Sequence, residues 1–198
     1  MAGGRCGAIV MGAALLAAGC GETGPEADVP ENRGEAATPA PLPELAGRVI
    51  LSGCRQGQCA WLRFVRLERV RSLSDGELRR LVARRGFSRY GFDAEPPSEF
   101  GDGVEVAWEP ADASAYAFCS TARPSYAFAD EDGGLILHRL DLFDLAGYQT
   151  ASATLYMRIC HGRDYPWEDA SALGRLGYRP GTPSEQREVA SPAEMIGP

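Results

Sequence analysis

Residues 48–67 read RVILSGCRQGQCAWLRFVRL, and this stretch decides the fold. Two runs of β-prone residues flank a short loop that contains glycine, which is the pattern of a β-hairpin. Cys54 and Cys59 lie at the two ends of that loop. If they face each other across the hairpin, a disulfide is feasible, because it needs Cα atoms about 4.4–6.8 Å apart.

Two segments further along carry helical patterns. Ser74 and Glu77 have the spacing of a capping box, and an apolar stripe at helical spacing follows them. Gly86 suits a left-handed closing residue, so we predict a helix over residues 74–86. Residues 149–160 also share one apolar face, and a glycine follows shortly after. We predict a helix there as well, although the β-prone content leaves a strand possible.

The remaining elements are predicted to be strands. Residues 104–109, 115–119 and 125–129 alternate apolar and polar side chains with period two. Residues 130–134 have the composition of a turn, and the strand expected at 135–140 completes a second hairpin. These patterns predict one small α+β domain, built from antiparallel strands and hairpins with one or two helices.

The N-terminal segment has the features of a secretory signal. Residues 1–7 carry one arginine and no acid, and residues 8–18 form an apolar run of eleven residues. A membrane-spanning helix needs about 20 apolar residues, so this run is too short to span. Residues 17–20, Ala-Ala-Gly-Cys, resemble the lipobox of bacterial lipoproteins. The resemblance implies cleavage before Cys20, diacylglycerol on its sulfur and usually a further acyl chain on its amine.

This resemblance implies a place in the bacterial cell envelope. Two or more acyl chains hold a protein stably on a membrane, because each buried methylene contributes about 0.8 kcal/mol. Gly21, where an aspartate would favour the inner membrane, implies the outer membrane, with the domain facing the periplasm. The membrane would then be a partner through the lipid on Cys20, without a spanning helix in the mature chain.

Composition divides the chain into four parts. Residues 1–19 are the expected signal peptide, and residues 20–46 the lipidated N-terminus with a disordered, acidic, proline-rich tether. Residues 47–180 are long enough for one hydrophobic core, so we expect a globular domain there. Residues 181–198 are expected to be a disordered tail.

Four cysteines fall in the expected domain: Cys54, Cys59, Cys119 and Cys160. In an oxidising compartment an even set suggests two disulfides, and four cysteines allow three pairings. The hairpin favours Cys54–Cys59, and Cys119–Cys160 would then close a longer loop. Metal binding by the thiolates is the alternative, but His138 and His161 are the only histidines. We therefore expect neither a metal site nor a cofactor.

Charge is segregated along the chain. With Arg5 removed by cleavage, 19 arginines face 27 acids, a net charge of about −8, which argues against nucleic-acid binding. Residues 48–89 hold eleven arginines and three acids, whereas residues 90–118 hold seven acids and no arginine. The two segments either pair with each other or leave an exposed basic face for an envelope protein or an anionic polymer. That face would comprise Arg66, Arg69, Arg71, Arg79, Arg80, Arg84 and Arg85.

No catalytic motif stands out. Cys160-His161 ends like a c-type haem site, but Met157 stands where the first cysteine is required. A cysteine–histidine dyad has no supporting motif around it. We therefore expect a membrane-anchored envelope lipoprotein with a binding role in the periplasm, and lean toward a non-enzymatic one. The alternatives are an envelope hydrolase with an unrecognised site and an inhibitor of a wall-degrading enzyme.

Overall fold

The computed structural model describes residues 41–91, 93–130 and 133–197. The expected signal peptide, the lipidation at Cys20 and most of the expected tether lie outside the described residues. Within the described ranges, none of the helices has the length and apolar character needed to cross a membrane.

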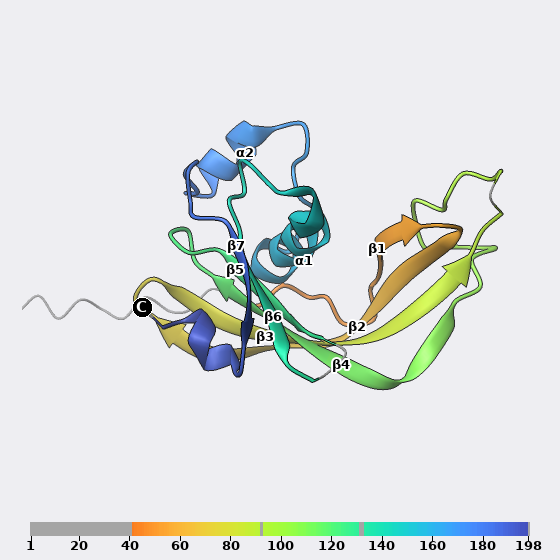
Figure 1. Cartoon of the computed structure of the whole chain (residues 1–198), viewed down its shortest axis with the longest axis horizontal. Coiled ribbons are helices and arrows are strands. Elements are labelled where there is room, and N and C mark those ends of the chain that lie inside the picture. The colour runs from red at the N-terminus through yellow and green to blue at the C-terminus, as the bar shows by residue number, and fades with distance from the viewer. Residues whose placement is uncertain (1–40, 92, 131–132, 198) are drawn as a thin grey trace, which may run out of the picture. The chain divides into compact units, whose positions relative to one another are not determined.

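A curled antiparallel sheet of seven strands forms the domain, and each strand pairs with the next one in sequence (Figure 1). The strands are β1 (Val49–Arg55), β2 (Gln58–Leu73), β3 (Gly76–Arg89), β4 (Ala107–Cys119), β5 (Ser125–Ala129), β6 (Leu135–Arg139) and β7 (Glu185–Val189). The helical elements are α1 (Thr150–His161), α2 (Ala170–Arg175) and the 3-10 turns η1 (Gly147–Gln149) and η2 (Pro192–Met195). The expected antiparallel sheet is present, but the domain is mostly sheet, so the α+β class is only partly matched.

The first hairpin is confirmed. β1 and β2 pair through Cys54 and Cys59, whose disulfide joins Cα atoms 4.0 Å apart. The two-residue turn between them consists of Gln56 and Gly57, both with positive φ (53° and 76°). Positive φ at both central residues matches the right-handed twist of hairpin strands.

The helix predicted over residues 74–86 is wrong, because residues 76–86 belong to β3 and residues 74–75 form the turn before it. β3 is paired with β2 on one side and β4 on the other, which satisfies its backbone in a ladder. Side chains alternate along a strand, so Leu78 and Leu81 point to opposite faces. Leu78 packs in one core cluster and Leu81 in the other. The apolar residues that imitated a helical stripe therefore serve both faces of the sheet.

The second hairpin and the second helix are confirmed. β5 and β6 pair antiparallel, with Ser125 opposite Arg139 at one end and Ala129 opposite Leu135 at the other. α1 ends at Gly162, whose φ of 67° is left-handed and whose N–H donates to the Arg158 carbonyl. The two strands expected at 104–109 and 115–119 are replaced by the single strand β4, which begins at Ala107.

Two core clusters lie on the two faces of the sheet. The larger one fills the space between the sheet and α1, and includes Phe64, Leu81 and Tyr156. α1 lies across the inner side of the curl (Figure 1). The Cys119–Cys160 disulfide ties its last turn to β4. The Cα atoms of this disulfide are 5.4 Å apart.

The structure differs from the sequence analysis at the C-terminal end. We expected a disordered tail over residues 181–198, but β7 pairs with β6 as the last strand of the sheet. Val189 and Met195 are buried in the second cluster against Leu78 and Phe118. Burial of these two apolar side chains orders the segment. Because only two residues are involved, the composition of the segment remains polar, and composition alone therefore predicted disorder.

Candidate binding site

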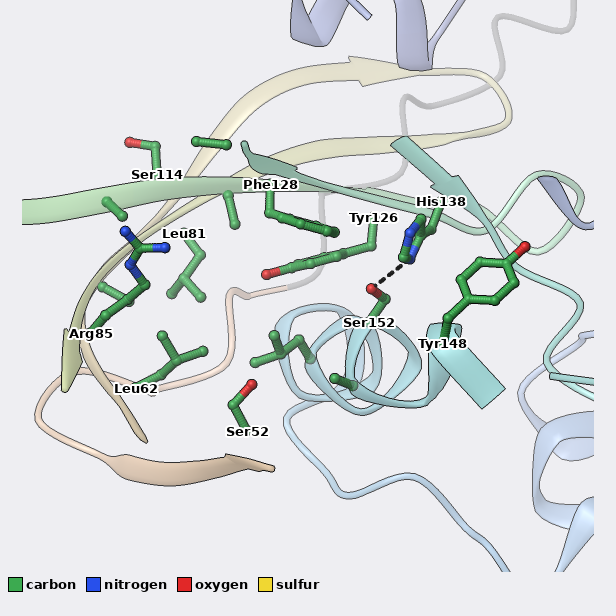
Figure 2. A pocket seen from close by; sticks show the side chains of 16 residues that line it. Ser52, Leu62, Leu81, Arg85, Ser114, Tyr126, Phe128, His138, Tyr148 and Ser152 are labelled. Atoms are coloured by element: carbon green, nitrogen blue, oxygen red, sulfur yellow. Dashed lines mark hydrogen bonds between the residues drawn. The ribbon is translucent and has the colours of Figure 1, made fainter. Parts of the chain in front are cut away.

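A cavity of about 270 Å³ lies between the inner face of the curled sheet and the first turns of α1 (Figure 2). Most of the side chains around it are apolar. It is lined by Ser52, Leu62, Leu81, Ala83, Arg85, Ala113, Ser114, Ala115, Tyr126, Phe128, Ala129, His138, Tyr148, Ala151, Ser152 and Leu155. Apolar clefts with a few polar groups are the usual form of small-molecule sites.

Small side chains create this cavity. Ala83 of β3 pairs with Ala113 of β4, and Ala115 lies opposite Leu81 in the same ladder. Ala151 of α1 also lines the cavity. Methyl groups on both the sheet and the helix cannot fill the space that larger side chains hold elsewhere in the core, so an open volume remains.

One end of the cavity carries a cation. Leu81, Ala83 and Arg85 are spaced two apart along β3, which places all three on the cavity side. The Arg85 side chain is 54% exposed and its Nε donates to Glu109 Oε2 at 3.1 Å. Ser114, also in the lining, accepts from the Arg80 guanidinium at 2.9 Å.

A buried polar group forms the other end, away from Arg85 in Figure 2. His138 Nδ1 lies 2.8 Å from Ser152 Oγ, and its Nε2 lies 3.1 Å from Gln186 Oε1. An amide oxygen only accepts, so Nε2 carries the proton and Nδ1 accepts from the Ser152 hydroxyl. Burial lowers the pKa of His138, and the Gln186 hydrogen bond only partly offsets this, which keeps the ring neutral near pH 7. Tyr148, 58% exposed, packs edge-on against this ring at the cavity opening.

The arginines of the expected basic face are mostly engaged with acids. Arg84 pairs with Asp112 at 2.8 Å, and Arg85 with Glu109 at 3.1 Å. Both pairs join the basic segment to the acidic one, as the internal-pairing alternative expected.

Within the basic segment, Glu68 lies 2.5 Å from Arg66 and 3.8 Å from Arg80, and Glu77 lies 2.9 Å from Arg69 and 2.8 Å from Arg79. Arg71 is exposed on β2.

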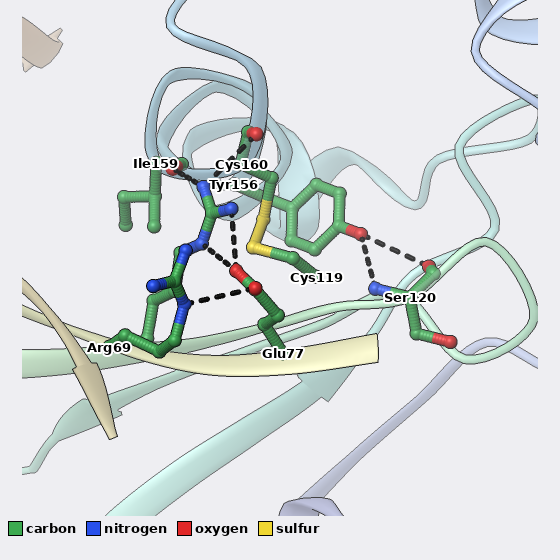
Figure 3. A network of polar contacts seen from close by, with 8 residues as sticks. Arg69, Glu77, Cys119, Ser120, Tyr156, Ile159 and Cys160 are labelled. Atoms are coloured by element: carbon green, nitrogen blue, oxygen red, sulfur yellow. Dashed lines mark hydrogen bonds and ion pairs between the residues drawn. A yellow bond between two sulfur atoms is a disulfide. The ribbon is translucent and has the colours of Figure 1, made fainter. Parts of the chain in front are cut away.

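Arg79 has a structural position rather than a surface one, and the residues that it contacts, Glu77, Ile159 and Cys160, are labelled in Figure 3. It is 5% exposed and its Nη1 donates to the carbonyls of Ile159 and Cys160 at 2.9 and 3.2 Å. These are carbonyls of the last turn of α1, where a cation is favoured by the helix dipole. The same guanidinium donates to Glu77 Oε2 through Nε and Nη2. Arg79 therefore joins the sheet to the end of α1.

A second polar chain supports the same end of α1. Tyr156 OH donates to the Ser120 carbonyl at 3.1 Å and lies 2.9 Å from Tyr178 OH, which in turn lies 2.6 Å from His161 Nε2. Burial, followed by Arg163 and Arg79, lowers the pKa of His161 to about 4.

The expected chemistry of the cysteines is settled by their pairing. All four cysteines of the described ranges form disulfides, so neither histidine has a thiol beside it for a nucleophilic dyad. In those same ranges, no group of three or more histidine, cysteine, aspartate or glutamate side chains is placed to hold a metal ion.

Sequence reasoning missed the cavity and the group around His138. Ser152 is 14 residues from His138 and Gln186 is 48 residues away, so no motif spacing connects them. The one signal in the sequence was the run of alternating alanines in residues 111–117. The chain matches no protein-family model, no curated protein and no solved structure.

Proposed function

We propose that this chain is a lipid-anchored lipoprotein of the bacterial envelope whose domain binds an apolar ligand without chemical change. The lipobox resemblance at Cys20 supports the anchor. The observation that carries the binding role is the cavity between the sheet and α1, with its alanine floor and exposed Tyr148 at the opening.

The composition of the cavity favours an apolar ligand. Burying apolar surface contributes roughly 25 cal/mol per Å², and the lining is dominated by alanine, leucine and aromatic side chains. Its volume of about 270 Å³ is close to the lower end of the range for small-molecule sites, roughly 300–1,000 Å³. The site thus suits a small or slender ligand rather than a peptide or polymer segment.

Filling the cavity tests this function. Ala115→Leu places three more carbons on the cavity floor and should abolish binding of 1-decanol, measured by isothermal titration calorimetry. The protein is the full mature chain, residues 20–198, with Cys20→Ser so that no lipid competes. Ala111→Leu is the matched control, because Ala111 is exposed on the same strand outside the lining. Binding by Ala115→Leu equal to that of the unsubstituted chain would refute the cavity as the site.

Ester hydrolysis is a second candidate function, favoured by the arrangement of Ser152, His138 and Gln186. In this scheme Ser152 Oγ attacks an ester carbonyl carbon while its proton passes to His138 Nδ1. The imidazolium then protonates the leaving alcohol, and water cleaves the acyl-serine by the same route. Gln186 would hold the ring in the required tautomer.

Covalent labelling separates the two functions. A fluorophosphonate should label Ser152 if it is a nucleophile, and Ser152→Ala should lose the label. Ser114→Ala is the control, because Ser114 lines the same cavity with no histidine hydrogen-bonded to it. A chain that binds 1-decanol and takes up no label has the binding role alone.

A further inference from the structure

We infer that the ligand of this cavity is a saturated acyl chain of about ten carbons that ends in a carboxylate, with the carboxylate at Arg85. This inference rests on the proposed binding function and adds to it the chemical class and the orientation of the ligand.

The volume sets the length of the chain. An apolar cavity of roughly 150 Å³ holds benzene, with six carbons. In proportion, the 270 Å³ between the sheet and α1 holds about eleven carbons. The apolar lining continues from Leu62 and Leu81 near Arg85 to Tyr126 and Phe128 near His138 (Figure 2). A linear chain lying along this path contacts mainly apolar side chains, together with the Tyr126 hydroxyl, which points toward Leu81 in Figure 2.

The charge of Arg85 selects the head group. A guanidinium has five N–H donors, and the Arg85–Glu109 contact engages Nε. In the described ranges neither Nη of Arg85 has another hydrogen-bond or ion-pair partner. Two parallel N–H groups match the two oxygens of a carboxylate.

Among the described residues that line the cavity, those at the opposite end carry no positive charge. His138 is neutral there, and the Ser152 hydroxyl already donates to its Nδ1. An amphiphile with one charged end is therefore oriented with its carboxylate at Arg85 and its methyl end near His138. Glu109 weakens this site by its own negative charge, which gives a second way to test it.

The test compares decanoate with 1-decanol by isothermal titration calorimetry on the full mature chain carrying Cys20→Ser. The chain with Cys20→Ser and no other substitution should bind decanoate about tenfold more tightly than 1-decanol. Arg85→Gln should remove that difference by weakening decanoate about tenfold, with 1-decanol unchanged. Arg84→Gln is the matched control, because Arg84 adjoins Arg85 and pairs with Asp112, but does not line the cavity. This variant should leave the affinity for both ligands unchanged.

Glu109→Gln provides the independent variant, and should tighten decanoate several-fold while leaving 1-decanol unchanged. Equal affinity for the two ligands, together with no effect of either variant, overturns the inference and leaves the proposed function standing. If Arg85→Gln fails to fold, Glu109→Gln alone decides, and an unchanged decanoate affinity overturns the inference. Failure of both ligands to bind refutes the proposed function itself.

Discussion

Arg79→Met should lower the free energy of unfolding by about 3 kcal/mol, a large effect for one arginine. The reason is its position beneath α1, where it is 5% exposed and donates to two helix carbonyls and to Glu77. Removing one partner of a buried ion pair costs about 3–5 kcal/mol, because the other charge is left uncompensated. Here the cost falls at the low end, since Glu77 keeps its contact with Arg69 at 2.9 Å.

The assay is urea unfolding of the mature chain at pH 7 with both disulfides intact. A lower midpoint with an unchanged slope reports a change in stability rather than in the unfolded state. Arg84→Met is the control, because the Arg84–Asp112 pair is 39% and 32% exposed, and an exposed pair contributes only about 0–1 kcal/mol.

Equal losses for Arg79→Met and Arg84→Met would refute the reasoning. That result would mean that the contacts at the end of α1 are exchanged for water at no cost. A loss of about 3 kcal/mol confined to Arg79→Met supports the assignment of Arg79 as the link between sheet and helix.

The remaining predictions concern the second disulfide, pH and the anchor. Replacing Cys119 and Cys160 with alanine opens a loop with a sequence separation of 41 and should cost about 4 kcal/mol, twice the cost of removing the hairpin disulfide, by calorimetry. Burial and nearby arginines lower the pKa of His161 to about 4, so its stabilising contribution is complete above pH 6.5 and is lost as the pH falls toward 4. The urea midpoint of the unsubstituted chain should therefore fall over that range more than that of His161→Gln, and parallel curves would contradict this. Cys20→Ser should leave the membrane fraction or retain its signal peptide, by fractionation and mass spectrometry, whereas an unchanged mass in the membrane would exclude lipidation.

Local patterns predicted the elements that depend on local interactions. The hairpin at Cys54–Cys59 has its two strands and its turn encoded within about twenty residues, and the helix α1 has its apolar face and its closing glycine encoded over a similar length. The helix prediction for residues 74–86 was wrong for a physical reason. A strand buried on both faces loses the period-two pattern, and its apolar residues can then match the spacing of a helical face. Its neighbours in the sheet, not its own sequence, determine its conformation.

The candidate site could not be predicted because it depends on what is absent from the core. The cavity exists where alanines from β3, β4 and α1 meet, and no single segment shows that they do. Arg85 was singled out for its charge, yet only the strand alternation beside Leu81 and Ala83 places it at the cavity. The pairing of arginines with acids, one of two alternatives from charge segregation, is seen directly at Arg84 and Asp112.

The position of β7 bears on the behaviour of the protein at high concentration. In the part of the chain that the structure describes, it is the last strand of the sheet, and such an edge strand is a template for association with another chain. Its sequence is Glu-Gln-Arg-Glu-Val, and such charged edges oppose pairing between copies. β6, which lies beside β7 in the sheet, reads Leu-Ile-Leu-His-Arg and begins with three apolar residues in place of charged ones. The polar C-terminal segment therefore opposes aggregation by covering the edge of β6. A chain shortened before residue 185 would leave β6 as the edge strand, and its apolar sequence favours self-association.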